Sequence, residues 1–134
     1  MTLPEFLLAR IAEDEAVARM CVEMFPTPWE ITDRGWRVRI YAADVPTEDM
    51  FSDDPDATSV RNPVVMEVEP DRHIEDPRWL SERVEHIARH DPARVLADCE
   101  ARRQLVEAMG DDWVTRVLAL PYADHPDFDE SWCP

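Results

Sequence analysis

Residues 86–103 decide the fold, and they read His86-Ile-Ala-Arg-His-Asp-Pro-Ala-Arg-Val-Leu-Ala-Asp-Cys-Glu-Ala-Arg-Arg103. Pro92 disfavours helical geometry at the residue before it, so a helix that reaches His90 has to end there. Asp91 is a good N-cap residue, and a proline is well tolerated at the first position of the helix that follows. The stretch therefore predicts a helix–turn–helix corner at His90–Asp91.

Similar start and stop signals predict the other helices. Asp76-Pro77 repeats the cap-then-proline pattern, Gly110 is a typical C′ residue, and Thr2 with Glu5 forms a capping box. Asp111 or Asp112 can cap a last, short helix. We expect helices over 3–24, 77–90, 92–109 and 112–120.

The apolar residues of the first helix recur at steps of three and four, which predicts one broad apolar face toward the core. These residues are Leu3, Phe6, Leu7, Ile11, Val17, Met20 and Met24. Glu13, Asp14 and Glu15 are expected to face water.

Alternation of apolar and polar residues predicts two strands. Residues 35–41 place Trp36, Val38 and Ile40 on one face, and residues 64–69 place Val64, Met66 and Val68 on one face. Arginines on the outer face of the first strand and glutamates on that of the second favour antiparallel pairing. Two strands alone are marginal, and residues 29–32 are the candidate for a third. The acidic connection over 42–59 is expected to be mobile.

The fold class that follows is α+β, with about four helices packed on a small antiparallel sheet of two or three strands. A chain of 134 residues is long enough for one modest core, so residues 1–134 are expected to form a single domain. Tyr122, Phe128 and Trp132 predict that the irregular tail over 121–134 packs on that core.

The formal net charge of -16 is concentrated in two segments without a basic residue, 42–59 and 121–134. Direct nucleic-acid binding is disfavoured, because it needs a basic surface. No segment has the ~20 apolar residues of a membrane span, and no signal peptide is expected before the first helix. The three cysteines form no close pair, so we expect free thiols in a reducing cytoplasm.

Three blocks resemble one family: Thr2-Leu-Pro-Glu-Phe-Leu-Leu-Ala-Arg-Ile-Ala-Glu-Asp-Glu15, the stretch from His86 to Arg102, and Leu118-Ala-Leu-Pro-Tyr-Ala-Asp-His-Pro-Asp-Phe128. It is a domain-of-unknown-function family of small proteins from actinobacteria and their phages. The resemblance implies a source of that kind, bacterial or phage, and brings no assigned activity.

Two histidines lie four residues apart, so His86 and His90 share one face of a helix and can reach one metal ion. His125 or Cys99 would complete a zinc site. A metalloprotease would place a glutamate directly after the first histidine, and Ile87 stands there. The simpler interpretation, which we favour, is that His90 stabilises a helix C-terminus and His125 forms local hydrogen bonds.

The middle of the chain also carries a mixed charge cluster, formed by Arg94, Arg102 and Arg103 beside Asp91, Asp98 and Glu100. It predicts an ion-pair network that clamps the tail through Asp124. An anion site is the alternative, which the like charge of Asp91 at the helix N-terminus disfavours.

No serine lies in an elbow-like turn, and two glycines cannot form a Gly-rich phosphate loop. We therefore expect a binding role rather than catalysis: an acidic accessory or regulatory protein of phage or prophage type. Its partner would be a protein, with a basic or nucleic-acid-binding one favoured. The interface residues would be Asp44, Glu48, Asp49, Asp53, Asp54 and Asp56. The alternatives are a zinc-binding protein and a structural component of a phage particle or homo-oligomer.

Overall fold

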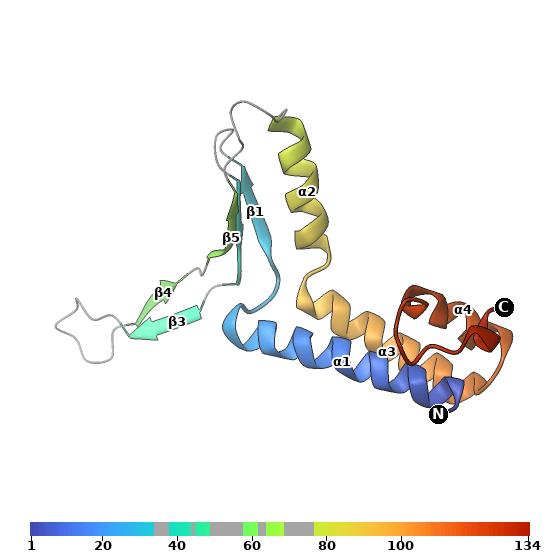
Figure 1. Cartoon of the computed structure of the whole chain (residues 1–134). Coiled ribbons are helices and arrows are strands. Elements are labelled where there is room, and N and C mark those ends of the chain that lie inside the picture. Colours follow the sequence, from blue (N-terminus) through green and yellow to red (C-terminus); the bar gives the residue numbers. More distant parts are fainter. Residues whose placement is uncertain (34–37, 44, 49–57, 62–63, 69–76) are drawn as a thin grey trace. The chain divides into compact units, whose positions relative to one another are not determined.

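The computed structural model describes residues 1–33, 38–43, 45–48, 58–61, 64–68 and 77–134 (Figure 1). These residues form helices and antiparallel strands, which confirms the α+β class. Backbone contacts divide the chain into two compact units. The first unit comprises Met1–Arg19 and Val95–Pro134, and the second comprises Met20–Arg94. Each is described by itself, and the single-domain expectation stays a prediction.

The first unit is helical. Helix α1 (Leu3–Met24) begins in it, and α3 (Pro92–Met109) runs antiparallel to α1 (Figure 1). Helix α4 (Trp113–Ala119) and two short 3-10 turns, Leu120–Tyr122 and Glu130–Trp132, complete it. Its core consists of Leu3, Phe6, Leu7, Ile11, Cys99, Val106 and Ala119. Each large apolar side chain buried there contributes about 1.5–3 kcal/mol.

The ends of these helices carry the predicted signals. The Thr2 backbone N–H donates to Glu5 Oε2 at 2.7 Å, and the Glu5 N–H donates to Thr2 Oγ1 at 3.4 Å. Gly110 follows α3 with a φ of 60°, and its N–H donates to the Val106 carbonyl at 3.0 Å. Asp112 caps α4 by accepting from the Trp113 N–H at 2.5 Å. The capping expectations at Thr2, Gly110 and Asp112 are confirmed, and Asp76 lies outside the described residues.

The second unit contains a three-stranded antiparallel sheet in the order β1-β2-β5. The strands are β1 (Glu30–Asp33), β2 (Val38–Tyr41) and β5 (Val64–Val68). Helix α2 (Pro77–Arg89) covers one face, where its Leu80 and Val84 pack against Val38 and Ile40. Strand β1 is the third strand of this sheet, and it overlaps residues 29–32, the segment predicted for it.

The register of β2 and β5 pairs Arg39 with Glu67, and the Arg39 Nε donates to the Glu67 carboxylate. The predicted cross-strand charge pair is therefore confirmed. The register shifts after Ile40, so that Val64 is 41% exposed while Val65 packs against the core. The inward orientation predicted for Val64 is wrong. The prediction assumed strict alternation along the strand, and the shift in register breaks that alternation before Val64.

A second, two-stranded sheet pairs β3 (Val45–Glu48) with β4 (Thr58–Arg61). Both strands overlap the connection that was expected to be a mobile loop, so its two ends form strands, and the expected mobility stays a prediction. Their β-branched residues favour strands, and the many acidic residues obscured this signal. Residues 49–57 lie outside the described residues, as do Trp36 and Glu69.

The chain breaks between α2 and α3 where Pro92 predicts. Helix α2 ends at Arg89, and Asp91 Oδ1 accepts from the Arg94 N–H at 2.9 Å. The corner is confirmed. No described helix has the length and apolarity that crossing a membrane requires.

The apolar face predicted for α1 is correct only in its first half. Phe6 is buried, but Val17, Met20 and Met24 are 65%, 68% and 71% exposed. They follow Phe6 by 11, 14 and 18 residues and so lie on nearly the same side of the helix. The C-terminal tail covers that side around Phe6. Local periodicity cannot show how far along a helix such a cover extends.

Candidate functional site

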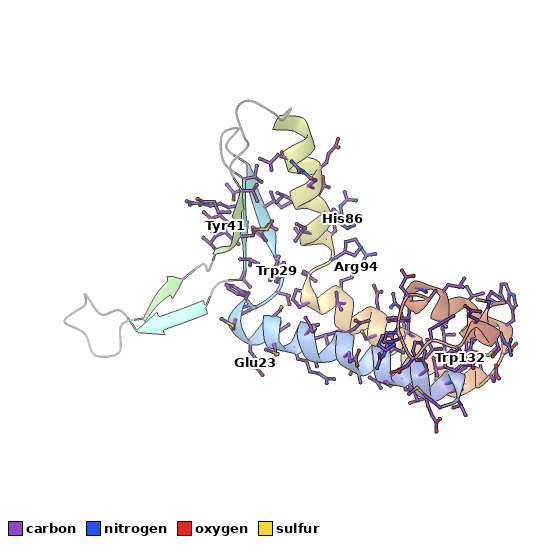
Figure 2. The ribbon with its side chains drawn as sticks, viewed as in Figure 1. Glu23, Trp29, Tyr41, His86, Arg94 and Trp132 are labelled. Carbon is purple, nitrogen blue, oxygen red and sulfur yellow. The ribbon has the colours of Figure 1, made fainter. Side chains whose placement is uncertain are left out.

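Aromatic rings from the C-terminal tail surround Phe6 at the start of α1. The Phe6 ring lies 6.3 Å from Tyr122, 5.6 Å from His125, 6.0 Å from Phe128 and 5.0 Å from Trp132, measured between centroids. Three of these contacts are edge-to-face, the arrangement that aromatic rings favour. Figure 2 shows Trp132 among the crowded side chains of this unit. The cluster confirms that the tail packs on the core.

Arg10 is the charged member of this cluster and is 9% exposed. Its guanidinium lies 5.5 Å from the Phe6 centroid, contacts His125 Nε2 and donates to Glu13 Oε1 at 2.8 Å. The buried Arg10 Nε has no partner among the described residues.

Tyr122 ties the tail to two helices. Its hydroxyl donates to Asp14 Oδ2 at 2.8 Å and lies 3.5 Å from Arg102 Nη1. Burial, followed by the hydrogen bond to Asp14, raises the pKa of Tyr122. The clamp therefore exists, but it runs through Tyr122 and Asp14, and the prediction that Asp124 forms it is wrong. Asp124 is exposed.

Glu15 is buried, with 6% exposure, although the sequence placed it in water. It accepts from Arg103 and lies 3.2 Å from Arg19 Nη2. The hydrogen bond from Arg103 is the largest cause of the lowered pKa of Glu15. The expectation failed because an acidic run such as Glu13–Asp14–Glu15 does not show which member meets an arginine from α3.

Cys99 and Thr115 complete the interior of this unit. Burial raises the pKa of the Cys99 thiol, and the nearby carboxylates of Asp14 and Glu15 add to the shift. Thr115 is fully buried, and its hydroxyl donates to the Asp112 carbonyl at 2.7 Å. Both residues are buried, and the contacts of the surrounding cluster hold α1, α3 and the tail together.

His86 and His90 lie in the second unit. Figure 2 shows His86 on the side of α2 opposite the sheet. The two histidine rings are 4.5 Å apart, and His90 Nδ1 lies 2.8 Å from the His86 carbonyl oxygen. A carbonyl can only accept, so His90 Nδ1 carries a proton in this contact. A shallow depression of about 160 Å³ beside them is lined by Glu82, Glu85, His86 and Arg89.

His125, the third predicted ligand, belongs to the first unit. Its Nε2 contacts Arg10, and its Nδ1 lies 3.1 Å from the Asp127 backbone nitrogen. The local contact predicted for it is present, and a metal ion would have to displace one of these neighbours. No group of three or more histidine, cysteine or acidic side chains within the described parts of the chain could hold a metal ion.

Most of the acidic residues predicted as an interface lie outside the described residues. These are Asp44, Asp49, Asp53, Asp54 and Asp56. Glu48 ends strand β3, and only its backbone is described.

Large apolar side chains on the outside of the helices are the feature that sequence reasoning missed. Met1, Met20, Met24 and Met109 are exposed, which is four of the five methionines that the structure describes. Trp113 is 65% exposed, whereas tryptophan is usually well buried. Helix α3 also shows the signal in its sequence: Ala97, Ala101, Leu105 and Met109 recur every four residues, and all four are exposed. Helix α3 therefore exposes apolar side chains in addition to those that it buries.

A family model matches residues 1–134. The chain belongs to the Family of unknown function (DUF6221). The resemblance to a family of unknown function is thereby confirmed, and it links the chain to relatives without assigning an activity. No curated protein and no solved structure matches the chain.

Proposed function

We propose that the protein is an accessory or regulatory protein that acts by binding another protein, in the host-cell cytoplasm and in a phage or prophage setting. The observation that carries the proposal is the exposure of Trp113 and of four methionines on a chain of charge -16. Tryptophan and methionine are enriched in protein interfaces, and methionine adapts to varied apolar partners.

The acidic surface supports a basic partner, which includes nucleic-acid-binding proteins. Complementary charge raises the rate of association and suppresses like-charged competitors.

The test is capture of a partner from an extract of the host organism on the immobilised full chain, repeated from 50 to 500 mM salt. The proposal expects one basic protein whose retention falls steeply with salt, because exposed charges are screened within about 10 Å at 0.1 M. If the amount of retained protein did not change with salt, electrostatic capture would be contradicted. If no protein were retained at any salt concentration, the proposed function would be contradicted.

A second candidate function is binding of a zinc ion through His86 and His90. It is favoured by the contact of His90 Nδ1 with the His86 carbonyl, which resembles the way metal-bound histidines are oriented. Elemental analysis of protein purified without a histidine tag tests it. Stoichiometric zinc that is lost in His86→Ala and His90→Ala would support this candidate, and zinc below a tenth of an equivalent would rule it out.

A further inference from the structure

Helix α4 has a buried side and an apolar outer side. Thr115 and Ala119 are fully buried, whereas Trp113 is 65% exposed and Leu120, directly after the helix, is 43% exposed. Half-buried Val117 lies between them, at steps of four and three residues. The three side chains therefore form one stripe on the outer side, about 10 Å long at the rise of an α-helix.

The end of α3 carries two more exposed apolar side chains. Leu105 and Met109, one turn apart, are 43% and 40% exposed. Three residues separate Met109 from Trp113, so their Cα atoms lie within about 14 Å even along an extended chain. Figure 1 shows the end of α3 and α4 in the same unit, joined by a short reversal. We name Leu105, Met109, Trp113, Val117 and Leu120 the α3–α4 face.

The charged residues near the α3–α4 face are mainly acidic. Asp111 and Asp112 are exposed at the start of α4, and a nearby arginine, Arg116, lies 3.4 Å from Asp111 Oδ1. A second copy would bring like-charged borders together on two chains of net charge -16 each. A basic partner is instead attracted by the negative charge of this chain. Charge therefore favours a basic partner over a second copy at the α3–α4 face.

We infer that the α3–α4 face docks the apolar side of a basic amphipathic helix from a partner protein. This rests on the proposed protein-binding function and names the surface and the chemistry of the partner. Residues spaced by four and three form a ridge that packs against the side chains of a second helix, and an amphipathic helix lays its apolar side on such a surface. Trp113 supplies the large anchor typical of the centre of an interface.

The test uses a fluorescein-labelled, 18-residue peptide of leucine and lysine at helical spacing, titrated with the full chain and followed by anisotropy. A leucine–glutamate peptide tests the sign of the charge, and a glutamine–lysine peptide tests the apolar side. We expect Trp113→Ala and Leu120→Ser each to weaken binding of the leucine–lysine peptide at least tenfold. Val17→Ser is the matched control, because Val17 is equally exposed in the same unit but on α1, and it should leave the Kd unchanged.

Three outcomes would overturn the inference: an unchanged Kd in both face variants, an equal loss in the control, or equal binding of either comparison peptide. A fourth outcome that would overturn the inference comes from sedimentation equilibrium at two concentrations. A dimer that Trp113→Ala abolishes would show that a second copy of the chain binds the α3–α4 face. A host partner captured equally by wild type and Trp113→Ala would overturn this surface and leave the proposed function standing. Failure to capture any partner would contradict the proposed function, whatever the peptide does.

Discussion

Buried polar residues determine how the first unit is assembled. Arg10, Glu15 and Thr115 are the buried polar or charged residues that the structure describes. A buried charge is tolerated only when it is paired. Glu15 meets Arg103 from α3, Arg10 meets His125 from the tail, and Tyr122 meets Asp14. Each contact joins segments that are distant in sequence, so these residues specify which surfaces pack together.

The substitution Glu15→Gln should destabilise the protein most at neutral pH. Because Arg103 lowers the pKa of Glu15, this carboxylate adds stability that is present above its ordinary value of 4.5 and is lost as the pH falls through the lower folded-state pKa. Urea unfolding at pH 7, 5 and 3 should therefore show a wild-type advantage that shrinks with acid. Glu23→Gln, at an exposed position on the same helix, should change little; an advantage of Glu15 that grows with acid would contradict this account.

The three cysteines should differ strongly in reactivity. Cys133 is exposed, Cys21 is intermediate, and Cys99 is buried with a raised thiol pKa. The thiolate is the reactive form, so iodoacetamide at pH 7.5 should label Cys133 first and Cys99 last, at least a hundredfold more slowly. Mass spectrometry of timed digests measures this order, with urea-unfolded protein as the control. Early labelling of Cys99 in the folded protein would show that α1 and α3 do not enclose it.

At the scale of elements, the C-terminal tail acts as a cover for the start of α1. Its 3-10 turns bring Tyr122, Phe128 and Trp132 around Phe6, and Arg116 Nη1 donates to the Ser131 carbonyl at 3.2 Å. The tail thus turns a helix surface into core without forming regular structure of its own.

Removing the centre of this cover should be costly. Phe6→Ala should reduce the free energy of unfolding by about 3–5 kcal/mol, the usual cost of deleting a buried phenylalanine. It should also make residues 121–134 sensitive to protease at 25 °C. Val17→Ala, at an exposed position on the same helix, should stay within about 0.5 kcal/mol of wild type. A loss below 1 kcal/mol for Phe6→Ala, measured by urea unfolding, would show that the tail does not pack there.

The reversal between α3 and α4 depends on one glycine. Gly110 has a φ of 60°, and a Cβ built on it would meet nothing within 4 Å. The cost of Gly110→Ala is therefore conformational alone, about 1–2 kcal/mol. Gly110→Asn should cost less, because asparagine tolerates the left-handed region better. Equal stability of all three proteins in urea unfolding would contradict this assignment.

The elements that were predictable carry their own local signals. The cap at Asp91 with Pro92, the capping box at Thr2 and the alternation in β2 each act within a few residues, and each is present. The predictions that failed depend on distant parts of the chain: how far the tail covers α1 beyond Phe6, the partner of Glu15 and the register shift that exposes Val64. The α3–α4 face was missed for the same reason, since only the packed core shows that the second apolar side of a helix is left over.

At the scale of the whole molecule, charge and exposed apolar surface act together. A net charge of -16 opposes self-association and keeps the exposed methionines and Trp113 from driving aggregation. In the proposed function, this charge serves to attract a basic partner over a distance, and apolar contacts set how slowly that partner dissociates. An acidic protein with an adaptable apolar face is suited to capturing one class of partner.

The most direct test of this account is to map the leucine–lysine peptide onto the full chain by ¹H–¹⁵N correlation spectra. The account predicts shifts concentrated at the amides of residues 105–120 and at the Trp113 indole N–H, reduced at least fivefold between 50 and 500 mM salt. Shifts that spread evenly over the acidic residues, or that leave residues 105–120 unmoved, would contradict it.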